Sequence, residues 1–477
     1  MTQDALPSRV FGSGDQQRFA TLTGDFNPVH MDPVAARRTQ AGAPVVHGVH
    51  AFLWMIDSIA ARYAELPPVA TLNARFFKVI YVGDVADIVV TKRDATALTA
   101  EVTAGGNVAL RLSATFGPAE RAPAAAHRDG RPAALHPASA LDLTIEVMAL
   151  MRGDVAFAEP VEEIASAFPA AHKLLGARRV AALGASTRLV GMICPGLHSF
   201  YAGLSLRMCD DAHEAAELAF EVTTAHSRLR VVRQNIAGGG LFGTVESFVR
   251  PSPVAQPSMA ALDRLIDADE FTGSVALIIG GSRGLGEVTA KLVAAGGGRV
   301  IITFASGVSE AKHVASEITE WGGHADILRY DVRQPPEPQL GELTAPPTHL
   351  YYFATPLIAR RKSSPFDRGR FDEFITYYVD GFYALCRALA RAGAPLSVYY
   401  PSSVYVEKWP DGLVEYAMAK AGGELLCTNI AAELKNVRVT ATRLPPLATD
   451  QTATLLHSQT ADPATVMLPV IRIVQGL

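Results

Sequence analysis

A proline-rich connector divides the sequence into two parts with different hydrophobic patterns. Residues 251–258 hold three prolines in eight positions, and chain of this kind is stiff and non-helical. The 477 residues exceed what one hydrophobic core normally supports. The sequence before the connector is typical of helices with antiparallel strands, and the sequence after it alternates strands with helices. We therefore expect two architectures on one chain.

The part before the connector shows one pattern twice. In residues 1–118 an apolar helix is expected over 47–63, and glycine-containing turns separate the strands that follow. Residues 119–139, rich in alanine and proline, are predicted to be a linker. Residues 140–253 repeat the order, with an apolar helical segment at 189–196. The strands are expected at 72–81, 86–93, 98–103 and 108–116 in the first copy, and at 200–208, 216–225, 228–235 and 241–249 in the second.

The part after the connector predicts a parallel sheet. Residues 254–269 are expected to be a linker, and 275–279 is a continuous apolar run, as in a strand buried on both faces. Further strands are expected at 300–303, 326–330, 350–353 and 396–400, and helices at 287–294, 310–321 and 371–392. This alternation indicates a doubly wound α/β domain over 270–477.

The segment Thr23-Gly24-Asp25-Phe26-Asn27-Pro28-Val29-His30 carries the first candidate site. Pro28 fixes its own φ and favours an extended Asn27, so the chain can turn Asp25 and His30 toward one point. A carboxylate and a neutral imidazole that face one point can move protons onto or off carbon and oxygen. A turn with an Asx cap is the alternative interpretation of such a segment.

With Phe19-Ala20 upstream and Val46-His47-Gly48 downstream, this segment resembles the MaoC-like, (R)-specific enoyl-thioester hydratases of the hot-dog fold. The resemblance implies that Asp25 and His30 are the catalytic pair and that Asn27 holds the loop. It also implies that the Gly48 N–H polarises a thioester carbonyl, a role that suits a free N–H at a helix start.

The second copy lacks this chemistry. Gly153-Asp154 echoes Gly24-Asp25, but no histidine follows at the matching spacing. We therefore interpret 1–253 as an α+β double hot dog in which the second copy is degenerate and forms one wall of the acyl site. His198, which follows Pro195-Gly196-Leu197, is either functional or a structural turn histidine, and its turn context favours the structural role.

A glycine-rich turn follows the first strand of the C-terminal part. Gly280, Gly284 and Gly286 lie between this strand and a helix, with Ser282, Arg283 and Leu285 among them. Glycine lets the backbone approach phosphates, and the helix N-terminus supplies N–H donors. The pattern indicates a nucleotide-binding turn, with a simple tight turn as the alternative.

A second group of polar residues lies later in the chain. Tyr416 and Lys420 are one helical turn apart, and Ser403 precedes Tyr416 by thirteen residues. A lysine ammonium near a phenol stabilises the phenolate and makes the phenol a usable proton donor.

The glycine turn and these three residues resemble the short-chain dehydrogenase/reductases from about residue 270 onward. The resemblance implies that Tyr416 donates a proton to a carbonyl oxygen that Ser403 holds. Lys420 would bind the nicotinamide ribose and lower the Tyr416 pKa. It further implies that Asp331 and Val332 contact adenine and that Thr449 contacts the carboxamide. The expected domain is thus a Rossmann-type α/β domain.

The sequence departs from that family at three places. Tyr378 falls where the family usually has an asparagine that anchors a proton-relay water. Phe353-Ala354-Thr355-Pro356 replaces the usual Asn-Asn-Ala-Gly, and Pro445-Pro446 replaces a Pro-Gly pair. These changes affect the proton relay, whereas Ser403, Tyr416 and Lys420, which hydride transfer would need, are all present.

The expected cofactor is NADP(H) rather than NAD(H). The end of the second strand, Thr303-Phe304-Ala305-Ser306, lacks the carboxylate that would bind a free ribose 2′-hydroxyl. Arg283 and Ser306 could instead receive a 2′-phosphate, because arginine suits phosphate.

Composition excludes several other classes of function. A net charge of −4 with scattered basic residues gives no nucleic-acid surface, and no apolar run is long enough to span a membrane. Four widely spaced cysteines and a polar N-terminus indicate a reducing compartment, which we take to be the cytoplasm. We expect an acyl-CoA or acyl-carrier-protein thioester as substrate, and a homodimer.

These expectations combine into one function. A bifunctional ketoreductase–dehydratase would reduce a 3-ketoacyl thioester with NADPH and dehydrate the 3-hydroxyacyl product to the trans-2-enoyl thioester. One alternative is the oxidative direction, enoyl hydration followed by NAD-dependent dehydrogenation. Another is that one domain, more readily the reductase, is an inactive binding or scaffold module.

Overall fold

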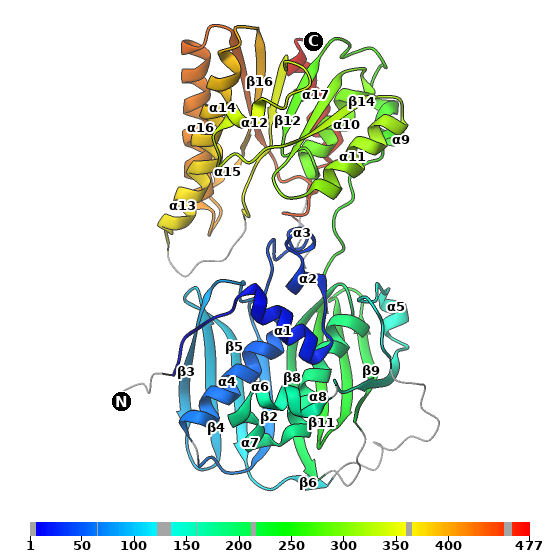
Figure 1. Ribbon diagram of the computed structural model, residues 1–477, viewed down its shortest axis with the longest axis vertical. Coiled ribbons are helices and arrows are strands. Elements are labelled where there is room, and N and C mark those ends of the chain that lie inside the picture. Colours follow the sequence, from blue (N-terminus) through cyan, green and yellow to red (C-terminus); the bar gives the residue numbers. More distant parts are fainter. Residues whose placement is uncertain are drawn as a thin grey trace. The chain divides into compact units, whose positions relative to one another are not determined.

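The chain forms two compact units, Met1–Ser252 and Pro253–Leu477, in a computed structural model (Figure 1). The structure describes residues 6–63, 65–121, 135–158, 160–210, 216–358, 365–452 and 460–477. Most of the linker expected at 119–139 therefore lies outside the described residues. Each unit has its own hydrophobic core.

The first unit is built on one continuous eleven-stranded sheet. The strand order is β1-β3-β4-β5-β2-β8-β11-β10-β9-β7, every neighbour along this path is antiparallel, and the short β6 pairs with β8. The strands are β1 (Arg9–Val10), β2 (Val69–Phe76), β3 (Val85–Arg93), β4 (Ala97–Ala104), β5 (Asn107–Phe116), β6 (Glu120–Arg121), β7 (Arg152–Ala156), β8 (Ser199–Asp210), β9 (Glu217–His226), β10 (Val231–Gly238) and β11 (Leu241–Val249).

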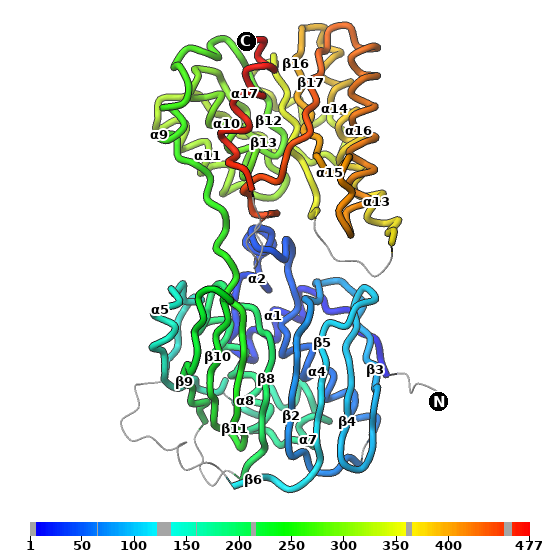
Figure 2. The backbone as a smooth tube through the Cα atoms, turned by 180° about the vertical axis from the view of Figure 1, so that it is seen from behind, coloured from blue at the N-terminus to red at the C-terminus, as the bar shows by residue number. Residues whose placement is uncertain are grey.

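The two halves of this sheet meet where β2 pairs with β8 (Figure 2). Leu72 lies opposite Leu206 and Ala74 opposite Leu204, so apolar side chains continue across the junction. Apolar pairs of this kind each stabilise a sheet by about 0.2–1 kcal/mol. The junction makes one core from two similar halves.

Each half carries a central helix against the same face of the sheet (Figure 1). Helix α4 (Gly48–Arg62) buries large side chains such as Phe52 and Ile56, each of which contributes about 1.5–3 kcal/mol. Helix α8 (Ala177–Arg188) buries mostly smaller residues instead, among them Ala181, Ala182, Gly184 and Ala185. The other helices are α1 (Ser13–Thr23), α2 (Pro28–Met31), α3 (Pro33–Ala36), α5 (Ile145–Met148), α6 (Val161–Ala167) and α7 (Pro169–Leu175).

The helix expected at 189–196 is placed differently. The helical segment begins at Ala177 and ends in a π-helical turn, η2 (Leu189–Ile193). Arginines at both ends of α8 and its small buried residues hide the apolar period from sequence analysis. Asp154 lies within strand β7, so its resemblance to Asp25 does not extend to structure.

The second unit contains a six-stranded parallel sheet in the order β14-β13-β12-β15-β16-β17. This is the doubly wound order 3-2-1-4-5-6, whose direction reverses between β12 and β15. The strands are β12 (Val275–Ile279), β13 (Arg299–Phe304), β14 (His324–Arg329), β15 (His349–Tyr352), β16 (Leu396–Ser403) and β17 (Val437–Leu444). The predicted parallel sheet is confirmed.

Helices cover both faces of this sheet (Figure 1). One face packs against α10 (Gly284–Ala295), α11 (Val308–Glu320) and α17 (Pro463–Gln475), and the other against α13 (Arg368–Ile375), α14 (Gly381–Ala390) and α16 (Val414–Glu433). A π-helical turn, η4 (Thr376–Asp380), separates α13 from α14 where one helix was expected. The shorter elements are α9 (Met259–Leu262), η3 (Asp263–Leu265), α12 (Pro336–Leu340) and α15 (Tyr405–Lys408).

All four cysteines are free and buried. Among the residues that the structure describes, no helix combines the length and apolarity that a bilayer crossing requires.

Candidate active sites

The loop that carries Asp25 is fixed at both ends. Helix α1 ends at Gly24, whose φ of 76° is left-handed and whose N–H donates to the carbonyl of Ala20. Asn27 caps α2 by accepting a hydrogen bond from the Val29 N–H, and Pro28 takes the first helical position. The sequence Thr23–His30 thus folds as a helix end followed by a helix start, with Asp25 between them.

Asn27 ties this loop to the second half of the unit. Its side-chain amide donates to the carbonyls of Gly191 (2.7 Å), Gly196 (3.1 Å) and Leu197 (3.3 Å). Both ends of the amide are therefore satisfied in a fully buried position. Asn27 therefore joins the loop to residues 191–197 of the second half.

The Asp25 carboxyl is buried against the second half, with 1% of the residue exposed. Thr187 of α8 donates its hydroxyl hydrogen to Oδ2 (2.7 Å), and the Asn27 N–H donates to Oδ1 (3.2 Å). A Cβ at position 191 would lie 2.2 Å from Oδ1, so only glycine fits there. Burial raises the pKa of Asp25, although His30 and Thr187 oppose the rise.

His30 presents one ring nitrogen as a base. Its Nδ1 lies 2.8 Å from the carbonyl oxygen of Val45, which can only accept. Nδ1 therefore carries the hydrogen and Nε2 keeps its lone pair. Burial, followed by the neighbouring His47, lowers the pKa of His30 to about 3, so the ring is neutral near pH 7.

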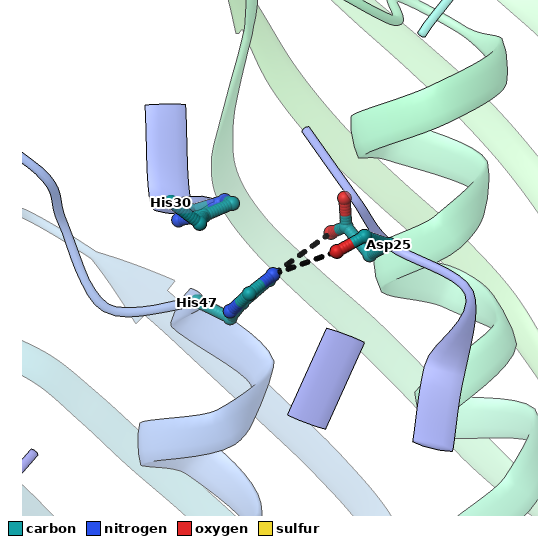
Figure 3. Close-up of side chains that lie close together, drawn as sticks. All are labelled: Asp25, His30 and His47. Atoms are coloured by element: carbon teal, nitrogen blue, oxygen red, sulfur yellow. Dashed lines mark hydrogen bonds and ion pairs between the residues drawn. The ribbon is translucent and has the colours of Figure 1, made fainter. Parts of the chain in front are cut away.

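His47 completes the cluster and was missed by sequence analysis (Figure 3). Its ring stacks on that of His30 with centroids 3.8 Å apart, and its Nε2 lies 2.9 Å from the Asp25 carbonyl and 4.0 Å from Oδ2. Its Nδ1 faces the Gln16 side-chain oxygen at 2.8 Å. Burial lowers the pKa of His47 to about 4. Donor or acceptor atoms of all three residues lie within 4.8 Å of one another.

Helix α4 begins beside this cluster. His47 is its N-cap and Gly48 its first residue, so the Gly48 N–H has no acceptor within the helix. A Cβ at position 48 would lie 3.0 Å from the ring of Phe76, which favours glycine. His198 is engaged elsewhere, with Nε2 3.4 Å from both Asp142 and Ser252.

The glycine turn of the second unit lies at the point where the strand order reverses. Gly280 has a φ of 76° and approaches the backbone after β15, where a Cβ would lie 3.1 Å from Phe353. A Cβ on Gly286 would lie 2.2 Å from the Gly280 carbonyl. The N-cap Arg283 makes no side-chain cap, so the first N–H groups of α10 remain for a ligand. These features fit a dinucleotide's phosphates.

Ser403, Tyr416 and Lys420 come together at one end of the sheet. Ser403 ends β16, and Tyr416 and Lys420 lie on successive turns of α16. Burial raises the pKa of Tyr416 to about 12, although a hydrogen bond with Ser403 acts to lower it. The phenol therefore keeps its proton at neutral pH. Burial lowers the pKa of Lys420 to about 7. Its ammonium donates to the Pro401 carbonyl at 2.6 Å.

The remaining predicted cofactor residues already have partners within the unit. Arg283 pairs with Asp450 at 3.4 Å, and Asp331 binds Arg333 through both carboxylate oxygens. Thr449 lies against Gly284, where a Cβ would come 3.7 Å from its methyl carbon. The other four positions differ in burial: Ser306 is exposed, Leu285 is partly buried, and Ser282 and Val332 are buried.

Comparison with known proteins assigns a relative to each end of the chain. The MaoC like domain matches residues 2–111, and the short chain dehydrogenase matches residues 274–341. The (R)-specific enoyl-CoA hydratase of Aeromonas caviae is 32% identical over 116 residues, 23% of this chain and 87% of that protein. An uncharacterized oxidoreductase of Escherichia coli is 27% identical over 184 residues, 36% of this chain and 74% of that protein.

A third relative combines two such activities in its name. The peroxisomal hydratase-dehydrogenase-epimerase of Saccharomyces cerevisiae is 30% identical over 105 residues. The match covers 21% of this chain but only 11% of the yeast protein.

His50 predicts a measurable pH dependence of folding. Burial holds its pKa well below 6.5, and its Nδ1 has no hydrogen-bond partner among the described residues. The unfolded chain binds a proton near pH 6.5 and the folded chain does not, so stability is full above that pH and is lost as pH falls. His50→Phe should therefore reduce the loss of unfolding free energy between pH 7.5 and 5 by about 2 kcal/mol.

Urea unfolding followed through Trp54 fluorescence, with Trp321 and Trp409 replaced by Phe, measures this loss. The exposed His172→Phe is the matched control and should leave the pH dependence unchanged. If His50→Phe and His172→Phe changed the pH dependence of the unfolding free energy equally, its attribution to His50 would be wrong.

Proposed function

Because the N-terminal part of the chain belongs to the MaoC-like family and its C-terminal part is a short-chain dehydrogenase/reductase domain, we propose that the protein is a bifunctional ketoreductase–dehydratase. It reduces a 3-ketoacyl thioester of CoA or acyl-carrier protein with NADPH and dehydrates the product to the trans-2-enoyl thioester. The observation that carries the proposal is the juxtaposition of Asp25 and His30, whose pKa values move in opposite directions.

The proposed dehydration gives Asp25 and His30 one proton transfer each. His30 Nε2 takes the proton from the α-carbon, and the C–H electrons form the new double bond as the β-carbon–oxygen bond breaks. Asp25, whose raised pKa favours its protonated form, gives its proton to the departing hydroxyl, which leaves as water. The Gly48 N–H stabilises the negative charge on the thioester oxygen. Proton return from imidazolium to carboxylate resets the site.

The second half of the sheet acts as a degenerate hot dog in this proposal. Its α8 and following strands repeat the helix-and-meander order of the first half. It supplies Thr187 and the space at Gly191 that hold the Asp25 carboxyl. In this proposal the two halves together form a single dehydratase site.

The reduction uses the second unit. Gly280, Gly284 and Gly286 would hold the pyrophosphate of a nicotinamide nucleotide, which supplies a hydride when bound. Tyr416 donates its proton to the substrate carbonyl oxygen, and Ser403 holds that oxygen.

NADPH is the proposed cofactor because no carboxylate ends β13 to bind a 2′-hydroxyl. Arg283 lies within the glycine-rich turn, where its guanidinium could contact a 2′-phosphate while it stays paired with Asp450.

Two alternatives to this function are each supported by one observation. The name of the yeast relative joins a hydratase to a dehydrogenase, which favours the oxidative direction. Tyr378 stands where the short-chain dehydrogenase/reductases usually have the asparagine of the proton relay, which favours a reductase unit that binds nucleotide without turnover. Cofactor preference separates the first alternative from the proposal, and nucleotide binding without turnover identifies the second.

Two substitutions separate the proposed steps. Purified protein receives a short 3-ketoacyl thioester and NADPH, and nicotinamide absorbance and the acyl products are followed. Tyr416→Phe should stop NADPH consumption, because the carbonyl oxygen loses its proton donor. Asp25→Asn should leave NADPH consumption intact and let the 3-hydroxyacyl thioester accumulate, with enoyl formation slowed about 10²-fold or more. Enoyl product at the unaltered rate from Asp25→Asn would refute the assigned dyad.

Gly191 tests whether the second half positions Asp25. Gly191→Ala places a methyl group 2.2 Å from Oδ1 and must displace the carboxyl. We expect dehydration to slow about 10²-fold while NADPH oxidation is unchanged, because small misplacements have effects of that size. Gly14→Ala is the matched control in α1, since no atom lies within 4 Å of the added methyl group. Parallel losses in both variants would point to a general loss of stability instead.

We also propose that the second unit pairs with another copy through α16. This helix exposes Met418 (47%) and Leu425 (74%) two turns apart. Leu425→Glu should convert a dimer to a monomer in light scattering, because burying an unpaired carboxylate is costly. Leu229→Glu, at an exposed turn of the first unit, should leave the mass unchanged. A monomeric unaltered protein would refute the pairing.

A further inference from the structure

The ammonium of Lys420 is enclosed by aromatic rings. Its Nζ lies 3.9 Å from the ring centroid of Tyr378, 4.8 Å from that of Tyr400 and 5.9 Å from that of Tyr416. Only 5% of the residue is exposed. The ammonium also donates a hydrogen bond to the Pro401 carbonyl at 2.6 Å.

The ring of Tyr378 is held in place from several directions. Tyr378 lies in the π-helical turn η4 and is 1% exposed. Its ring stacks on Phe374 at 5.7 Å and 8°, and meets Tyr416 edge-on at 5.7 Å and 80°. Its hydroxyl is hydrogen-bonded to that of Thr355. The ring therefore cannot leave Lys420 without losing packing and a hydrogen bond.

The rings supply the attraction that a carboxylate would otherwise provide. Among the described residues no carboxylate lies within ion-pair distance of Lys420, and the nearby Glu424 is bound to Arg443 and Ser402. The faces of aromatic rings carry negative charge and attract cations, most strongly where water is excluded. The contact favours the charged lysine in a position where burial disfavours it.

Lys420 and the tyrosine rings around it lie in the cofactor site of the proposed reductase. Lys420 is one helical turn from Tyr416 in α16, and its ammonium donates to the carbonyl of Pro401, near the end of β16 where Ser403 lies. We propose that Tyr378 competes with a bound nicotinamide nucleotide for Lys420. The proposal rests on nucleotide binding by the second unit. The ammonium must leave the face of the Tyr378 ring before it can donate to the nucleotide. The ring therefore weakens nucleotide affinity and limits the contribution of Lys420 to the free energy of nucleotide binding.

A series of rings of one shape and graded face charge tests this competition. Phenylalanine and its progressively fluorinated forms are placed at position 378, and the Kd for NADPH is measured by nucleotide fluorescence without acyl substrate. Fluorine withdraws charge from the ring face with little change of shape, so folding is preserved. Tyr378→Phe should bind like the unaltered chain. The most fluorinated ring should bind about tenfold more tightly, with intermediate rings in order.

Lys420→Met identifies the partner of the ring. In this background the dependence of Kd on fluorine should disappear, because no cation remains to be released. A flat series with Lys420 present, a dependence that survives Lys420→Met, or no NADPH binding in any variant would overturn the proposal. An ordered series without ketoacyl turnover would support it while refuting the reductase activity. Ketoacyl turnover with the same Kd throughout the fluorinated series would support the reductase activity and refute the competition by Tyr378.

Discussion

The carboxyl of Asp25 depends on a contact between residues far apart in the chain. Thr187, 162 residues away, donates to one carboxyl oxygen, and the backbone at Gly191 leaves room for the other. Asn27 joins the same two segments through its side-chain amide. A buried carboxyl is costly unless its oxygens are hydrogen-bonded, so the site exists only when both halves of the sheet are folded together.

Burial also sets the protonation of the site. Desolvation pushes the pKa of the Asp25 carboxyl upward and that of each imidazole downward, so burial favours the uncharged form of every group in the cluster. The Val45 carbonyl decides which nitrogen of His30 is the base. In the second unit burial keeps the Tyr416 phenol protonated. Both sites thus use removal from water as their main means of tuning acid strength.

Sequence analysis could identify the parts of each site that lie within one short segment of the chain. The loop from Gly24 to His30 and the turn from Gly280 to Gly286 are defined by proline and glycine, whose backbone preferences are visible in the letters. Thr187 and Gly191 were missed because their role comes from a contact across the sheet. His47 stood in the quoted Val46-His47-Gly48 segment, but only the fold shows its ring against His30. The alanine-rich α8 lacked a clear apolar period, and the π-helical turn around Tyr378 interrupted a segment that looks continuous.

The pairing of β2 with β8 places two similar halves on one polypeptide. Identical subunits in a symmetric dimer change together, because one mutation alters both surfaces of the interface. Here each half is encoded separately, so a substitution in one is not copied into the other. The half that lacks Asp25 and His30 supplies Thr187 and Gly191, so a substitution there can change the surroundings of the Asp25 carboxyl without altering the half that carries it.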